Sequence, residues 1–251
     1  MLKGLIFDLG GTLMHFDGKF EEVDRLANEH LVAFLRAHNL ATPDDFHARL
    51  IEHRKRHWRA AEDTGVEARV GEAIRDTLAE IGHRSLDGLM PRIIQAYFVQ
   101  HEAHWLAYPD SVETLRVLHA RGLRLGVISN ADDEHLVYRA TERLGFAPFV
   151  NPVLSSAADP RWRKPDARIF HLISDAWQIA PNEIAMVGDS PRYDIIGAHN
   201  AGMRGILIDR ADGAPWQKIP DEFANDPLWQ ADAIVHAVAE IPAVVDRWMI
   251  D

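Results

Sequence analysis

Cysteine is absent from the 251-residue sequence, which excludes disulfide bonds, thiolate nucleophiles and cysteine-ligated zinc. No apolar run approaches the length that is needed to cross a bilayer. The N-terminal segment does not resemble a signal peptide, because only a few apolar residues separate Lys3 from Asp8. We therefore expect a cytoplasmic protein with no membrane segment.

Basic residues are scarce relative to acidic ones. The sequence has 27 Lys and Arg against 38 Asp and Glu, a formal net charge of −11. A negative field of this size opposes binding to DNA, RNA and anionic lipid. We expect a small-molecule ligand rather than a nucleic acid or a membrane, and the sequence does not indicate an oligomeric state. Any anionic ligand needs a local pocket of positive charge or a bound cation.

Short apolar or β-branched runs, each followed by a polar or glycine-rich turn, are typical of buried parallel strands. Helical patterns alternate with the later runs, which predicts right-handed βαβ units. We therefore expect an α/β fold with a doubly wound, mostly parallel sheet of Rossmann-like type. The expected strands are 2–8, 124–129, 153–155, 184–188, 205–209 and 231–236, and the expected helices are 111–121, 133–144, 165–177 and 192–201.

One long segment breaks this alternation. Residues 17–106 show helical periodicity and no convincing strand, which predicts an inserted helical domain in a core made of residues 1–16 and 107–251. Ligands of open α/β sheets bind beyond the carboxyl ends of the strands, so an insertion after the first strand would roof that site. The expected helices of the insertion are 20–38, 43–61, 66–81 and 89–104.

Four expected strands deliver chemically useful side chains at or soon after their ends. A Mg²⁺ ion held by Asp8 and Asp189 would cancel the repulsion between a carboxylate and a phosphate dianion. Ammonium, hydroxyl and backbone N–H groups would hold the other phosphate oxygens. The carboxylate would then attack phosphorus and form an acyl-phosphate that water hydrolyses. The side chains concerned are Asp8, Ser129, Asn130, Lys164, Asp189, Ser190 and Asp194.

The motifs "DLGGTL", "VISN", "KPDARIF" and "VGDSPRYDIIGAHNAGM" occur in this order along the chain. Together they resemble the haloacid dehalogenase-like (HAD) hydrolase superfamily, over residues 1–16 and 107–250. The insertion after the first motif resembles the helical C1-type cap of that family. Only 33 residues separate Asn130 from Lys164, which is too few for the larger C2-type cap.

The resemblance implies a role for each motif residue. Asp8 corresponds to the nucleophile, and Lys164 to the catalytic lysine that also contacts the substrate. The Mg²⁺ site would comprise Asp8, the Gly10 carbonyl and Asp189, with Asp194 and Ser190 behind it. The remaining substrate-binding positions are Gly11, Thr12, Ser129 and Asn130.

Gly10 departs from the phosphatase pattern, because most phosphatases of this superfamily have a second aspartate there. That group protonates the leaving oxygen and then activates water. We expect a Mg²⁺-dependent phosphatase of a small phosphorylated metabolite. The alternatives are 2-haloacid dehalogenation, phosphonatase-like chemistry, or a weakly active or non-catalytic phosphate-binding member.

Some residues outside the motifs are also candidates for the site. In the basic stretch at residues 52–60, one of Arg54, Arg56 and Arg59 could reach the cleft to bind an anionic group, although a solvated helix face is the simpler interpretation. Trp58 is expected to pack rather than to stack on substrate. His15 follows the glycine turn and is a candidate to replace the missing acid–base group.

Overall fold

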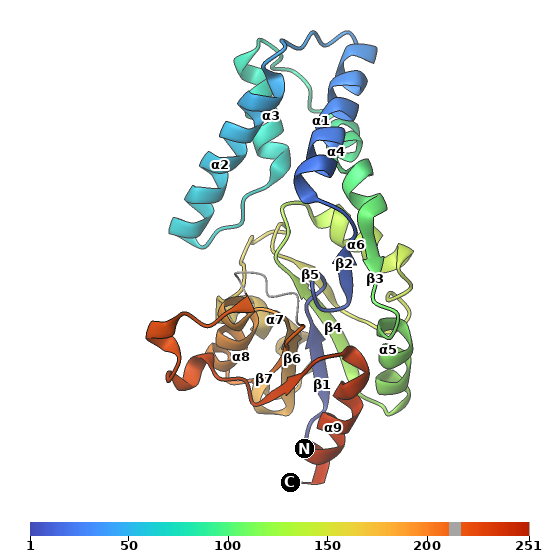
Figure 1. Cartoon of the computed structure of the whole chain (residues 1–251), viewed down its shortest axis with the longest axis vertical. Coiled ribbons are helices and arrows are strands. Elements are labelled where there is room, and N and C mark those ends of the chain that lie inside the picture. Colours follow the sequence, from blue (N-terminus) through green and yellow to red (C-terminus); the bar gives the residue numbers. More distant parts are fainter. Residues whose placement is uncertain (211–216, 251) are drawn as a thin grey trace.

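The computed structural model describes residues 1–210 and 217–250, and its centre is a six-stranded sheet (Figure 1). Every strand pairs in parallel with its neighbours. The first strand is central and the chain winds outward from it in both directions, which confirms the expected doubly wound α/β fold. In spatial order the strands are β5 (Val153–Ser155), β4 (Arg124–Ser129), β1 (Gly4–Phe7), β6 (Ile184–Gly188), β7 (Arg204–Ile208) and β8 (Ala233–Val235).

The side chains of β1 alternate between two hydrophobic clusters, one on each face of the sheet. Leu5 and Phe7 belong to the first cluster and Ile6 to the second, and all three are fully buried. Because helices cover both faces, β1 is apolar at every position rather than at alternate ones. The first cluster includes α5 (Ser111–Ala120), α6 (Glu134–Arg143) and α9 (Ile241–Ile250), and the second includes α7 (Ala167–Trp177) and α8 (Ile196–Asn200).

Four helices between the first and second strands of the main sheet form a group beyond its carboxyl edge (Figure 1). They share a third hydrophobic cluster, which contains Leu31, Leu35, Phe46, Ile74 and Tyr97. Each such buried side chain contributes about 1.5–3 kcal/mol when it leaves water, so this cluster holds the four helices together. They are α1 (Phe20–Ala37), α2 (Phe46–Thr64), α3 (Val70–Glu80) and α4 (Met90–His104).

The structure adds two short strands at the base of these helices. β2 (Met14–Phe16) pairs antiparallel with β3 (Trp105–Ala107), where the chain leaves for the helices and where it returns. The expectation of no strand within residues 17–106 was therefore wrong at its C-terminal edge. Three residues are too few to show the alternation by which a strand is recognised in sequence.

Several expected helices have different limits in the structure, and two of these differences have a local cause. The helix expected at 66–81 begins only at Val70, because the preceding loop forms a β-bridge between Val66 and Trp162. The helix expected at 192–201 is divided into a π-helical turn, Pro191–Ile195, and α8. Such turns are frequent at functional sites. None of the helices in the described part of the chain is long and apolar enough to span a membrane.

Candidate active site

Three carboxylates gather at the carboxyl edge of the sheet. Asp8 directly follows β1, Asp189 directly follows β6, and Asp194 lies in the turn after β6. Since β1 and β6 are adjacent, their ends meet, and oxygens of the three side chains lie within 4.8 Å of one another. All three side chains are buried.

The Lys164 ammonium lies within this cluster and binds two of its members. Lys164 Nζ is 2.7 Å from Asp8 Oδ1 and 2.6 Å from Asp194 Oδ1, and the side chain is only 2% exposed. Asn130 fixes the lysine backbone, because its amide accepts from Lys164 N at 2.9 Å and donates to Lys164 O at 3.0 Å. Asn130 therefore positions Lys164 as well as lining the cavity.

Glycines make room for two of the carboxylates. Gly11 has a φ of +74°, and a Cβ there would overlap the Asp189 carboxylate. A Cβ on Gly188 would overlap Asp194 in the same way. Both carboxylates can therefore lie against the backbone only because these two positions lack side chains.

Burial and mutual repulsion set the charges of the cluster. Burial raises the pKa of Asp8 to about 7, with Asp194 and Asp189 adding to the rise, while Lys164 opposes it. Burial also lowers the pKa of Lys164, but the carboxylates of Asp194 and Asp8 outweigh this and hold it above its ordinary value. When all of them are ionised, three carboxylates and one ammonium carry an excess of negative charge in a buried site.

This excess charge fits a bound divalent cation. The groups that converge here are oxygens, which Mg²⁺ prefers, and Mg²⁺ takes one or two protein carboxylates with carbonyls and waters. Asp194 has both oxygens engaged, since Oδ1 accepts from Lys164 and Oδ2 accepts from Ser190 N at 3.0 Å. Asp8 and Asp189 directly follow the adjacent strands β1 and β6 and are the candidate carboxylates for the ion.

Sequence reasoning missed one neighbour of this cluster. Gln217 Nε2 donates to Asp189 Oδ2 at 3.0 Å, from a segment 28 residues further along the chain. No motif marks Gln217, and only tertiary folding brings it to the site. Ser190 accepts from Tyr193 N at 3.3 Å through its hydroxyl and so caps the turn that carries Asp194.

A cavity of about 360 Å³ lies above the carboxylates. Among the residues proposed from sequence, those that line it are Asp8, Gly10, Ser129, Asn130, Lys164, Asp189, Ser190 and Asp194. Gly11 and Thr12 are not part of its lining. Thr12 is fully buried, and the carbonyls of both residues accept hydrogen bonds from Arg210, at 3.2 Å and 2.9 Å. These two hydrogen bonds hold the backbone of the turn that contains Gly11 and Thr12.

Gly10 faces an aromatic ring instead of an acid. A Cβ built on Gly10 would lie 3.4 Å and 3.6 Å from two ring atoms of Trp105, the first residue of β3. The cavity wall beside Asp8 is therefore apolar at the place where the usual second aspartate would project. His15 does not line the cavity, and its ring instead packs on Tyr108, with the centroids 4.9 Å apart.

The helices contribute a polar group to the opposite side of the cavity. Arg54, Tyr97 and His101 line it, and all three contact the buried Asp24 carboxylate. Burial raises the pKa of Asp24, but hydrogen bonds from His101 and Tyr97 and the Arg54 charge together hold it well below its ordinary range. Arg54 Nη1 lies 2.8 Å from Asp24 Oδ1, so this arginine faces the cavity with its direction fixed.

Of the three arginines in the basic stretch, only Arg54 lines the catalytic cavity. Arg56 is 65% exposed and hydrogen-bonds His53 on its own helix. Arg59 lines a separate surface hollow with Arg49 and Glu52. Trp58 is 57% exposed and lines a second cavity, and the expectation that it packs rather than stacks on substrate stays a prediction.

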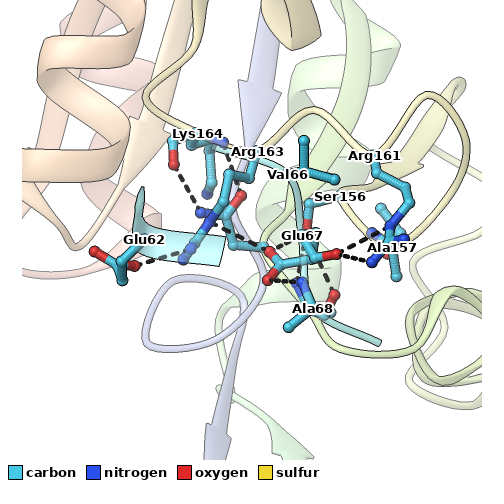
Figure 2. A network of polar contacts seen from close by, with 12 residues as sticks. Glu62, Val66, Glu67, Ala68, Ser156, Ala157, Arg161, Arg163 and Lys164 are labelled. Atoms are coloured by element: carbon cyan, nitrogen blue, oxygen red, sulfur yellow. Dashed lines mark hydrogen bonds and ion pairs between the residues drawn. The ribbon is translucent and has the colours of Figure 1, made fainter. Parts of the chain in front are cut away.

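A loop between α2 and α3 joins the helices to the segment that carries Lys164 (Figure 2). Glu67 N donates to Arg161 O at 3.0 Å, and the Glu67 carboxylate accepts from Ser156 Oγ at 2.7 Å. Arg163, next to Lys164, pairs with Glu62 at 2.8 Å and lies 3.5 Å from Glu67. Because Arg163 also lines the catalytic cavity, this network connects the helices to the cavity wall.

The family model for haloacid dehalogenase-like hydrolases matches residues 2–202. The chain belongs to this family. It is therefore a hydrolase of the HAD superfamily, as the four motifs predict, and the doubly wound sheet is the fold of its solved structural neighbours.

The relatives of this HAD-like hydrolase include two chemistries. A phosphoserine phosphatase of Thermus thermophilus is 34% identical over 47% of this chain and 46% of its own length. An (S)-2-haloacid dehalogenase of Burkholderia cepacia is 33% identical over 56% of this chain and 55% of its own length. The chain thus spans about half the length of these two relatives.

A crystal structure of a 2-haloacid dehalogenase from Pseudomonas syringae covers the fold almost completely. It superposes with a TM-score of 0.73 at 27% identity, and covers 99% of this chain and 100% of that one. Phosphatases and dehalogenases are therefore both relatives of this chain, and similarity alone does not distinguish the two reactions.

Proposed function

We propose that this hydrolase is a Mg²⁺-dependent phosphatase of a small phosphorylated metabolite, with Asp8 as the nucleophile. The proposal rests on one observation: the Asp189 carboxylate lies in the same buried cluster as Asp8. Dehalogenation needs no metal, because halide leaves without a proton. A second carboxylate beside the nucleophile would therefore only repel an anionic haloacid, whereas it completes a site for a cation that a phosphate ester requires.

The residues around the cluster have defined tasks in this reaction. When bound between Asp8 and Asp189, with the Gly10 carbonyl as a further ligand, Mg²⁺ supplies positive charge to a phosphate oxygen. Lys164 and the Ser129 hydroxyl bind other phosphate oxygens, and Asp194 holds Lys164 in place. Asp8 attacks phosphorus, and water then hydrolyses the aspartyl-phosphate.

We propose further that residues 17–106 act as a cap over a core made of the rest of the chain. The four helices have a hydrophobic cluster of their own, and their polar residues reach the cavity opposite Asp8. The substrate's leaving group would then lie between the two parts. The substrate is accordingly a phosphate ester small enough for a cavity of about 360 Å³.

Dehalogenation of a small 2-haloacid is the second candidate, and one observation favours it. Gly10 brings no acid to the site, and the Trp105 ring makes the adjoining wall apolar, which suits a leaving group that needs no proton.

Phosphate and halide release should be measured on panels of phosphomonoesters and 2-haloacids, with Mg²⁺ and with EDTA. We expect Mg²⁺-dependent phosphate release that is abolished in Asp8→Asn and in Asp189→Asn. Asp175→Asn is the matched control, because this aspartate is exposed on α7. Halide release that persists in EDTA would assign the chain to the dehalogenases instead. Phosphate binding without turnover on either panel would make it a non-catalytic member.

A further inference from the structure

The phosphatase reaction leaves one proton without a donor. The oxygen of an alkyl leaving group must be protonated as its bond to phosphorus breaks, and Gly10 has no side chain that could do this. Another group of the cavity must serve, and this inference rests on the proposed phosphatase function.

Most titratable side chains of the cavity are already engaged. Asp8 is the nucleophile, Asp194 is bound to Lys164 and Ser190 N, and Asp189 accepts from Gln217. Tyr97 donates to Asp24 at 2.6 Å, and burial raises its pKa well above the ordinary value. Such a phenol holds its proton too tightly to act as an efficient acid near neutral pH.

Among the described residues that line this cavity, Asp132 carries the remaining carboxyl group. It lies three residues beyond Ser129, the last residue of β4, and lines the catalytic cavity. Within residues 1–210 and 217–250, its side chain forms no hydrogen bond or ion pair with another side chain. Among the described residues that line this cavity, it is thus the one carboxyl group with no hydrogen bond or ion pair to another side chain.

Asp132 also lies where a leaving group would pass. A second cavity of about 500 Å³ lies among α1, α2 and the loop that follows α2, and it is lined in part by Ile51 and Trp58. Asp132, Arg54 and Phe20 line both cavities and therefore mark their junction. A substrate with its phosphate at Asp8 and its other end in the second cavity runs past the Asp132 carboxyl group.

We propose that Asp132 is the general acid and base of this enzyme, in place of the aspartate that Gly10 lacks. As Asp8 attacks phosphorus, the bond from phosphorus to the ester oxygen breaks, and that oxygen takes the Asp132 proton and leaves as an alcohol. The Asp132 carboxylate then takes a proton from the water that attacks the aspartyl-phosphate. This releases phosphate and restores both Asp8 and the protonated Asp132.

The surroundings of Asp132 favour this role. Burial raises its pKa, which keeps a proton available, while the Arg54 charge from α2 and His101 from α4 moderate the rise and Asp133 adds to it. The segment is fixed by the hydrogen bond from Val70 N to Asp132 O, at 2.9 Å. Because Val70 begins α3, the helices that cover the site also hold the acid in position.

Leaving-group dependence tests the proposal directly. We would measure kcat/KM for 4-nitrophenyl phosphate, phenyl phosphate and the best alkyl phosphate of the panel, in wild type and Asp132→Asn. The expected loss is about 10²–10⁴-fold for the alkyl ester, and only a few-fold for the nitrophenyl ester, whose leaving group needs no proton. Retained nitrophenyl turnover also shows that the variant is folded.

Asp175→Asn is the matched control, since Asp175 is exposed on α7 and lines neither cavity. This variant should keep the wild-type ratio of alkyl to nitrophenyl turnover. An equal loss on all three esters in Asp132→Asn, or no loss, would overturn the role of Asp132 and leave the phosphatase proposal standing. Absence of phosphate release from every ester in wild type would instead overturn the phosphatase function and the inference with it.

Discussion

Lys164 Nζ lies 2.6 Å from Asp194 Oδ1 and shares its charge with Asp8, at 2.7 Å. Asp194 Oδ2 accepts from Ser190 N, so the aspartate holds the ammonium from a fixed position. The lysine thus neutralises buried negative charge. In the proposed reaction it would also direct the nucleophile, so the same group would be both structural and catalytic.

Lys164→Met should lower the free energy of unfolding by about 3–5 kcal/mol, because it leaves buried carboxylates without their cation. Thermal or denaturant unfolding at pH 7 measures the loss. Lys3→Met is the control, since Lys3 forms only a surface ion pair with Glu183 and should change stability little. Equal stability of the two variants would contradict the charge-neutralising role.

Adjacent glycines should differ sharply in their tolerance of alanine. Gly11→Ala requires φ = +74°, which costs an L-residue about 1–2 kcal/mol, and it pushes on the Asp189 carboxylate. Displacing that carboxylate should reduce kcat/KM by about 100-fold. Gly10→Ala places its Cβ at ordinary contact distance from Trp105 and should stay within a few-fold of wild type. Similar activity losses in both variants would argue against this account of the turn.

The Glu67 carboxylate should make stability depend on pH. Burial raises its pKa in the folded protein, although Arg163 and the hydrogen bonds from Ser156 and Ala68 oppose the rise. A raised carboxyl pKa contributes stability that is fully present below the unfolded pKa and is lost as the pH rises through the folded pKa. Glu67→Gln has no such titration.

The Tm of Glu67→Gln minus the Tm of wild type should therefore increase as the pH rises from 4 to 8. Melting curves across this range measure it. Glu52→Gln, on an exposed part of α2, is the control. Lys55 lowers the pKa of Glu52, so the Tm of this variant relative to wild type should not increase over the same pH range. A constant difference for Glu67→Gln would contradict the raised pKa.

Arg54 should be the arginine of the basic stretch that matters for both stability and turnover. Arg54→Ala removes a charged hydrogen bond to the buried Asp24 and should cost about 1.5–3 kcal/mol. It also removes a cation from the cavity lining, so substrate KM should change. Arg59→Ala should leave Tm and KM close to the wild-type values. A decrease in stability or a change in KM as large as that of Arg54→Ala would contradict the assignment of Arg54, and not Arg59, to the lining of this cavity.

The sequence by itself determined the fold class and the positions of the main strands along the chain. Buried parallel strands are continuous apolar runs, so 184–188 and 124–129 could be recognised locally and match β6 and β4 residue for residue. The chemical types at the strand ends, Asp8 and Asp189 among them, were visible for the same reason. Neighbouring parallel strands end at one edge, so those groups had to meet.

Only the tertiary structure decided what surrounds them. Trp105 is nearly a hundred residues from Gly10 and faces it because β2 and β3 pair at the base of the helices. Helical periodicity places Arg54 and Arg59 on a helix, but packing against Asp24 directs only Arg54 into the cavity. Asp132 likewise is a candidate acid only because the folded chain places it in the lining of both cavities. Local patterns encode strands and their end groups, whereas contacts between distant segments depend on how the completed elements pack.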